Sequence, residues 1–276
     1  MHFNYRRSYR GPIQAVLLDW AGTIMDFGCM APALVFVEVF ERKQVPITID
    51  EARAPMGAHK RVHIQRITEL DAVRLRWQEA HGRLPNDDDV SAMFAEFVPL
   101  QLACLSTYST LIPGTLEVVA DLRARGIKIG STTGYLGEMM KINQADAKRQ
   151  GYEPDATVCA GDVPAGRPYP YMCLQNVIKL GVSAVQACVK IDDTVPGVEE
   201  GLNAGMWTIA LAVSGNEVGM ALAEWRALSP AAQQAKRERA YARLQQCGAH
   251  YVVDSIADVL PCIDDIQARI RRGETP

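Results

Sequence analysis

The sequence predicts an α/β protein whose core is a doubly wound parallel sheet, with an all-helical cap inserted after the first strand. From residue 113 onwards, short apolar runs typical of strands alternate with helical patterns, which implies right-handed βαβ units and a parallel sheet. The stretch after the first apolar run, by contrast, shows helical patterns and no convincing strand. We therefore expect a core domain of residues 1–27 and 108–276 and a helical cap domain of residues 28–107.

The first predicted strand, residues 13–18, ends at Asp19, and a small, turn-prone tripeptide follows. Helical patterns then continue through the cap, with breaks near Pro46, Gly57 and Pro85. Asp50 is expected to cap the second helix, because an aspartate oxygen accepts the free backbone N–H groups of a first turn. The cap helices are expected at 33–43, from 50 onwards, and at 60–68, 71–81 and 87–106.

The other core strands are short apolar runs bounded by glycine, proline and polar residues. They are expected at 127–131, 156–160, 187–191, 206–213 and 251–253. Helices are expected between and after them, at 113–125, 136–150, 168–180, 195–204, 230–246 and 256–271. The last strand and helix close the core.

Composition narrows the class of protein. The net charge is only −3 and 48% of the residues are hydrophobic, so no basic excess indicates a nucleic-acid partner. The seven cysteines are an odd number without a Cys-x-x-Cys pair, which suits reduced thiols in the cytoplasm. The chain begins without an apolar signal region, and no run reaches the ~18 apolar residues of a membrane span. We expect a cytoplasmic protein that binds neither nucleic acid nor membrane.

Polar residues follow four of the predicted strands. They are Asp19; Ser131 to Gly134, ahead of a helix; Arg167, in the loop 161–168; and the pair Asp192 and Asp193. The carboxyl ends of parallel strands meet at one edge of a sheet, where open α/β sheets bind ligands. Carboxylates can hold Mg²⁺, while hydroxyls, backbone amides at a helix start and a guanidinium can hold phosphoryl oxygens. Each residue alone could still be a turn, a helix cap or a surface charge.

This pattern resembles the haloacid dehalogenase-like superfamily. The resemblance rests on Asp19-x-x-Gly22-Thr23, Thr133-Gly134, the downstream Arg167 and the acidic pair, and covers residues 13–213. Most members are phosphatases that form an aspartyl-phosphate with Mg²⁺ and carry a mobile cap. Such phosphatases generally have an aspartate two residues after the nucleophile, to protonate the leaving group, and this chain has Ala21 there. Either catalysis is lost, or the leaving group does not need that acid.

Lys60 offers the second explanation, although a lysine on a helix is by default a solvated surface residue. An amine that condenses with a substrate carbonyl forms an iminium, which accepts electrons from a breaking bond at the adjacent carbon. Several local strings are similar to the phosphonoacetaldehyde hydrolase family: Asp19-Trp20-Ala21-Gly22-Thr23, Pro55-Met56-Gly57 with Lys60, Gly130 to Tyr135, Val163 to Pro170 and Asn203 to Thr208. The resemblance implies conversion of phosphonoacetaldehyde and water to acetaldehyde and phosphate, with one Mg²⁺ per subunit and a Schiff-base lysine. It also implies a homodimer that forms through the caps, and an upstream transaminase acting on 2-aminoethylphosphonate.

The resemblance assigns roles residue by residue. Asp19 is the nucleophile and a metal ligand, Ala21 offers its backbone carbonyl to the metal and Asp193 a carboxylate, and Lys60 forms the Schiff base. The phosphoryl group is bound by Thr133 or its neighbour Thr132, by Gly134 and by Arg167. Supporting positions near these groups are Cys29, Met56, His63, Tyr135 and Asp192. The superfamily usually has a further acid four residues after Asp193, where this chain has Gly197; Asp192 or Glu199 could substitute for it.

Alternatives stay open at this stage. His59 and His63 have the i, i+4 spacing of zinc ligands, but no third ligand accompanies them. We interpret His59 as a surface residue and His63 as one that could move protons near Lys60. The competing functions are a Mg²⁺-dependent phosphatase or phosphomutase acting on a phosphate ester, and an inactive binding protein of the same fold.

Overall fold

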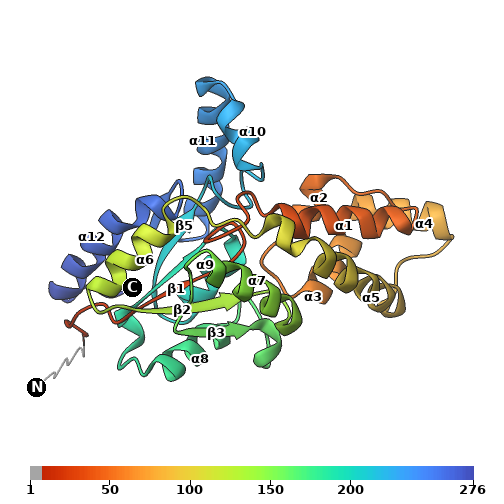
Figure 1. The fold of residues 1–276 in the computed structure, drawn as a ribbon. Coiled ribbons are helices and arrows are strands. Elements are labelled where there is room, and N and C mark those ends of the chain that lie inside the picture. The colour runs from red at the N-terminus through yellow and green to blue at the C-terminus, as the bar shows by residue number, and fades with distance from the viewer. Residues whose placement is uncertain (1–7) are drawn as a thin grey trace, which may run out of the picture.

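The computed structural model describes residues 8–276, and within them six strands form one fully parallel sheet in the order β3-β2-β1-β4-β5-β6 (Figure 1). The strands are β1 Ala15–Leu18, β2 Lys128–Thr133, β3 Ala156–Cys159, β4 Cys188–Asp192, β5 Trp207–Leu211 and β6 Tyr251–Val253. Leu18 at the end of β1 lies opposite Ser131 and Ile191. The ends of the three central strands are thus level with one another, and the predicted doubly wound sheet is confirmed.

Helices cover both faces of the sheet, because alternate residues of each strand point to opposite faces. Val16 and Leu18 belong to the apolar cluster that includes α6 Thr115–Ala124, α7 Gly137–Arg149 and α12 Val259–Arg271. Ala15 and Leu17 pack with α8 Tyr171–Leu180, and Ala210 packs with α9 Val195–Asn203 and α11 Pro230–Gln246. The four residues of β1 are fully buried, which explains its uninterrupted apolar sequence.

Five helices, separated along the chain from the others, lie together at one side of the sheet in Figure 1. They are α1 Met30–Arg42, α2 Ile49–Arg53, α3 Lys60–Glu69, α4 Asp71–His81 and α5 Asp87–Cys104, with a 3₁₀ turn at Leu105–Tyr108. Helix α5 packs against α1 and α3. Phe36, Ile64, Trp77 and Phe97 are buried between these helices. Within residues 28–107 the helices are joined by turns and loops, with no strand between them, as predicted.

Two helix starts differ from the sequence prediction. The N-cap of α2 is Thr48, because its hydroxyl accepts the Glu51 N–H at 3.1 Å while the Glu51 carboxylate accepts the Thr48 N–H at 2.8 Å. The expectation that Asp50 caps this helix was wrong. Helix α1 begins three residues earlier than expected, since the Asp26 carboxylate accepts the N–H groups of Met30 and Ala31, both at 3.0 Å.

Other differences lie at element ends. Strand β2 continues through Thr133, β5 ends at Leu211, and a short helix that was not predicted, α10, spans Leu222–Ala227. The stretch Asp87–Tyr108 is long and apolar enough to cross a membrane by length and composition alone, so the expectation that no run reaches this length was wrong. This is weak evidence of a span. The stretch starts with three aspartates, and Val90, Met93 and Phe97 are buried between the helices of the insertion.

Candidate active site

Asp19 lies directly after β1 at the carboxyl edge of the sheet, where only 6% of its surface is exposed. Its N–H donates to the Ile191 carbonyl at 3.1 Å, which ties it to the end of β4. The tight turn that follows depends on Gly22, whose φ is +81°. A Cβ at this position would lie 2.4 Å from Oδ2 of Asp193, so no other residue fits there without displacing that carboxylate.

Three carboxylates gather at this edge. One oxygen each of Asp19, Asp192 and Asp193 lies within 4.8 Å of the others, and all three residues are buried. Asp193 is held by the Asn216 N–H at 2.8 Å, the Cys29 thiol at 3.1 Å and the Thr23 hydroxyl at 3.3 Å. Burial and the neighbouring carboxylates raise the pKa of Asp193 well above its ordinary value.

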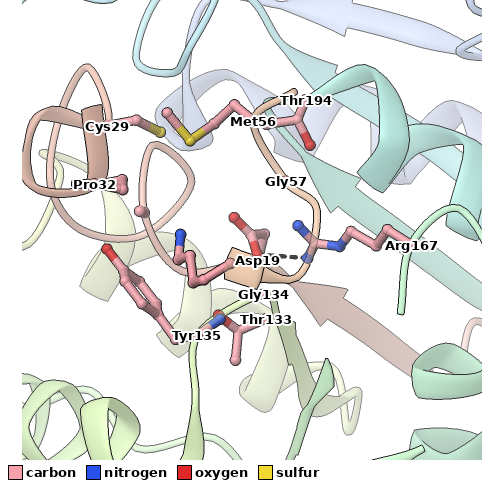
Figure 2. A pocket seen from close by; sticks show the side chains of 12 residues that line it. Asp19, Cys29, Pro32, Met56, Gly57, Thr133, Gly134, Tyr135, Arg167 and Thr194 are labelled. Atoms are coloured by element: carbon pink, nitrogen blue, oxygen red, sulfur yellow. Dashed lines mark hydrogen bonds and ion pairs between the residues drawn. The ribbon is translucent and has the colours of Figure 1, made fainter. Parts of the chain in front are cut away.

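Arg167 reaches these carboxylates from the loop before α8. Its Nη2 donates to Oδ1 of Asp19 at 2.6 Å (Figure 2). The same nitrogen lies 3.0 Å from Oδ2 of Asp192. Its Nε donates to Oε2 of Glu200 at 3.1 Å. Burial raises the pKa of Asp19, and the charge of Arg167 opposes that rise. The guanidinium thus lies beside the expected nucleophile, as the sequence predicted.

Lys190 and Glu200 complete a buried charge network that the sequence analysis missed. Lys190 Nζ donates to Oδ2 of Asp192 at 2.8 Å and to the Thr132 hydroxyl at 2.7 Å. Glu200 Oε2 accepts from the Thr132 hydroxyl and from Arg167. A lysine between Val189 and Ile191 in an otherwise apolar strand was the available signal, because such a charge is buried only with partners.

The donor set of this network fits a divalent cation. Its four carboxylates (Asp19, Asp192, Asp193 and Glu200) face two cationic side chains (Arg167 and Lys190), which leaves two negative charges when all are ionised. Carboxylate oxygens at a buried site are the ligands that Mg²⁺ and Ca²⁺ prefer. The residues present can therefore bind a divalent metal ion.

Lys60, the first residue of α3, lines a cavity together with Asp19. Its Nζ lies 4.6 Å from the ring centroid of Tyr135 and 5.8 Å from that of Phe36. Burial lowers the pKa of this amine from its ordinary 10.5 to about 8. Lys60 is therefore not the solvated surface lysine that composition alone would suggest, and a larger fraction of its amine is neutral near physiological pH than for an ordinary lysine.

One cavity contains residues from both the insertion and the core. It is lined by Asp19, Ala21, Cys29, Pro32, Met56, Gly57, Lys60, Thr133, Gly134, Tyr135, Arg167 and Thr194 (Figure 2). The two parts approach each other closely at Gly57, whose φ is +91°: a Cβ there would lie 2.5 Å from the Thr194 hydroxyl. The phosphoryl-binding candidates Thr133 and Gly134 line the cavity, whereas the Thr132 hydroxyl belongs to the charge network below it.

Besides Thr132 and Asp193, described above, three further candidate residues do not line this cavity. His63 is fully buried among the helices of the insertion, where its Nε2 donates to the Ala52 carbonyl at 2.8 Å and its ring stacks on Phe36 at 3.8 Å. Burial holds its pKa well below the ordinary value, so it is neutral. Glu199 is only half-buried and is not part of the carboxylate group. Asp192 lies in the charge network instead of lining the cavity.

Comparisons with known proteins agree with this geometry. A family model described as haloacid dehalogenase-like hydrolase matches residues 13–205. The chain is 46% identical to the phosphonoacetaldehyde hydrolase of Hahella chejuensis, over 100% of this chain and 94% of that one. It is 48% identical to the enzyme of that name from Vibrio cholerae, over 96% and 98% of the two chains.

Solved structures agree with these sequence comparisons. A phosphonoacetaldehyde hydrolase-like protein from Oleispira antarctica superposes with a TM-score of 0.97 at 44% identity, over the full length of both chains. A β-phosphoglucomutase from Clostridium difficile superposes with a TM-score of 0.64 at 17% identity, a likeness of fold alone.

Proposed function

Because this chain belongs to the phosphonoacetaldehyde hydrolase family of haloacid dehalogenase-like hydrolases, we propose that it hydrolyses the P–C bond of phosphonoacetaldehyde to acetaldehyde and phosphate. The observation that carries the proposal is the presence of Lys60 and Asp19 in one buried cavity. Ala21 supports it, since a methyl group stands where ester phosphatases carry an acid. A carbon leaving group that departs as an enamine does not need that acid.

The amine of Lys60 begins the reaction. Its pKa of about 8 leaves part of it neutral near physiological pH, so its lone pair can attack the aldehyde carbon. Loss of water gives an iminium between Nζ and the former carbonyl carbon. The P–C bond then lies next to an electron-poor C=N bond, which can accept its electron pair.

Asp19 carries out the second covalent step. One of its oxygens attacks phosphorus, and the P–C bonding electrons move into the iminium to form an enamine on Lys60 and a phosphoryl group on Asp19. Arg167 and the Thr133–Gly134 turn would bind the phosphoryl oxygens. Their presence in the cavity, with Arg167 2.6 Å from Asp19, supports this role. Protonation and hydrolysis of the enamine release acetaldehyde and Lys60, and water hydrolyses the aspartyl-phosphate to phosphate.

The metal that we propose is Mg²⁺, one per subunit, held by Asp19, Asp193 and the Ala21 carbonyl. When bound, it would neutralise negative charge on the phosphoryl group as Asp19 approaches. The buried carboxylate group supports this assignment. Three donors hold the Asp193 carboxylate: Thr23 and Cys29, both between β1 and α1, and Asn216, after β5.

The proposal also covers the domain organisation, oligomeric state, location and pathway of the enzyme. We propose that residues 28–107 act as a cap domain over a core of 1–27 and 108–276. Two such caps would form a homodimer, and the exposed Leu34 and Leu75 offer apolar surface for that contact. The family resemblance supports a cytoplasmic enzyme in the degradation of 2-aminoethylphosphonate, downstream of a transaminase.

Reductive trapping tests the proposal. Borohydride added with phosphonoacetaldehyde should leave a stable adduct on Lys60, detected by peptide mass spectrometry. The exposed Lys141 of helix α7 provides the matched control: Lys141→Ala should retain trapping and turnover, whereas Lys60→Ala should lose both. Turnover by Lys60→Ala would show that the Schiff-base mechanism is wrong. Faster turnover of phosphate esters than of phosphonoacetaldehyde would favour the phosphatase alternative.

A further inference from the structure

Arg53, the last residue of α2, is a buried cation of the insertion. Only 7% of its surface is exposed, and in the part of the chain that the structure describes no carboxylate forms an ion pair with it. Taking a guanidinium out of water is costly unless its N–H groups find other acceptors. The acceptors of Arg53 therefore show what holds this side chain in place.

Those acceptors lie where the insertion meets the core. Nη1 donates to the Gly28 carbonyl at 2.8 Å and to Oδ1 of Asn216 at 3.3 Å, and Nη2 donates to the Gly219 carbonyl at 3.1 Å. In return, Nδ2 of Asn216 donates to the Arg53 carbonyl at 3.4 Å. Asn216 and Gly219 belong to the segment 214–220, which follows β5. Arg53 thus connects the insertion to a distant segment of the core.

The backbone around the guanidinium depends on two glycines. Gly219 has a φ of +61°, and a Cβ there would lie 2.8 Å from both Cζ and Nε of Arg53. Gly28 has a φ of +88°, and a Cβ there would lie 2.2 Å from the Met220 carbonyl oxygen. The Gly28 N–H donates to the Ser214 carbonyl at 2.7 Å. Glycine at both positions therefore lets Arg53, the start of the insertion and segment 214–220 pack closely together.

The helix that carries Lys60 is fixed to α2, which ends at Arg53. The Arg53 carbonyl accepts the Met56 N–H at 3.0 Å and so begins the turn that follows α2. Lys60 is the first residue of α3, and in the same turn of that helix His63 donates from Nε2 to the Ala52 carbonyl at 2.8 Å. These bonds join α2, the turn and the start of α3. A displacement of Arg53 therefore also displaces Lys60.

The geometry points to a positioning role: Arg53 fastens the cap to segment 214–220 and thereby holds Lys60 in the cavity that it shares with Asp19. This inference deepens the reaction proposed above and rests on it for the role of Lys60. The fastening is reversible, because the oxygen acceptors of Arg53 are neutral carbonyl and amide groups. Water can replace them when the cap moves away, without leaving a buried carboxylate unpaired.

Hydrogen–deuterium exchange tests the fastening without relying on activity. Arg53→Met should accelerate exchange of the backbone amides at 53–60 and 214–220 by about tenfold, because the contact that holds these segments together is lost. Exchange in β1 and β4 should stay unchanged. Arg53→Lys keeps the charge but donates from a single nitrogen, so its exchange should lie between that of Arg53→Met and that of the original chain.

Chemical assays test the consequence for Lys60. In Arg53→Met, borohydride trapping of phosphonoacetaldehyde on Lys60 and kcat/KM should both fall by about 10- to 100-fold, the usual effect of displacing a reacting group slightly. Inorganic phosphate serves as a probe of the core alone, since Arg167 and Thr133 do not belong to the cap. Its affinity, measured by isothermal titration calorimetry, should stay within about threefold of the original value.

A second variant breaks the same contact from the core side. Gly219→Ala directs a Cβ at the guanidinium and keeps every charge, so it tests the contact even where Arg53→Met does not fold. It should reproduce the effects on exchange and trapping, and Arg53→Met/Gly219→Ala should add nothing further. Gly126→Ala is the matched control, with a left-handed backbone but no atom within 4 Å of its Cβ. Arg42→Met, which removes a cap arginine paired with Glu38 of the same helix, is the control for Arg53→Met. Neither control should change exchange at the two segments, trapping or turnover.

Three outcomes would overturn the inference. The first is unchanged exchange at 53–60 and 214–220 in both Arg53→Met and Gly219→Ala. The second is faster exchange spread evenly over the core, which would indicate general destabilisation, and the third is loss of phosphate affinity in step with trapping. An original chain that neither traps nor turns over phosphonoacetaldehyde would refute the proposed function and the role of Lys60, whereas failure of the exchange experiment alone would refute only the fastening by Arg53.

Discussion

Replacing Lys60 with methionine should abolish activity and at the same time stabilise the fold. The ammonium group is buried, and among residues 8–276 no carboxylate forms an ion pair with it. Its pKa is lowered from 10.5 to about 8. Since one pKa unit corresponds to about 1.4 kcal/mol, keeping Lys60 protonated destabilises the folded state by about 3 kcal/mol.

Methionine fills a similar volume without a charge. It loses the attraction between the ammonium and the Tyr135 ring, which is about 1 kcal/mol for a cation over an aromatic face. We therefore expect Lys60→Met to raise the free energy of unfolding by about 2 kcal/mol near neutral pH. Denaturant titration measures this quantity directly. The same change in the exposed Lys141 should leave it within about 0.5 kcal/mol of the original value.

The pH dependence gives the sharper test. Below the folded-state pKa of about 8, Lys60 is protonated in both the folded and the unfolded chain, so it destabilises the folded state by the full amount. Between about 8 and 10.5 the unfolded chain binds the proton more strongly, so the stability of the original protein rises with pH and the advantage of Lys60→Met shrinks. A constant difference between the two proteins across this range, or no difference at all, would refute the reasoning.

Three further results are expected. First, kcat/KM should rise with pH and level off above about 8, because the attacking amine of Lys60 must be neutral; a flat pH–rate profile would contradict this. Second, Gly134→Ala should lower kcat/KM about 10- to 100-fold, since its Cβ would lie 2.9 Å from the Ala58 carbonyl and push the cap loop away. Gly137→Ala, with no atom within 4 Å of its Cβ, should have no effect. Third, Arg167→Met should lower the free energy of unfolding by about 3 kcal/mol, because it removes the buried guanidinium that pairs with Asp19 and Glu200; unchanged stability in denaturant titration would argue against it.

Local patterns in the sequence were sufficient for the fold and for the candidates at the strand ends. The alternation of apolar runs and helical patterns predicted all six strands within a few residues of their observed bounds. The parallel direction of the strands followed, because strands that alternate with crossover helices form βαβ units. Asp19, Arg167 and Asp193 could therefore be placed at one edge of the sheet before any distance was known.

The N-terminal ends of helices α1 and α2 were less predictable, because they depend on which of several nearby oxygens accepts a free backbone N–H group. Thr48 and Asp50 are both good N-cap residues, and the choice between them depended on the reciprocal bond with Glu51. Asp26 lengthened α1 at its start in the same way. Propensity alone does not distinguish such alternatives.

What the tertiary structure decided is the direction and surroundings of each side chain. Thr132 and Thr133 are neighbours in β2, so they point to opposite sides, and only packing shows that Thr133 lines the cavity. His63 is buried in the interior of the insertion, where it donates to the Ala52 carbonyl, and its sequence position alone did not show this.

Gly197 was a missing acid in the sequence, whereas in the fold it is the space that the carboxylate of Asp192 fills. Sequence spacing determines which residues can meet at an edge. Which atoms then touch depends on contacts between segments far apart in the chain, and those are set only when the whole core packs.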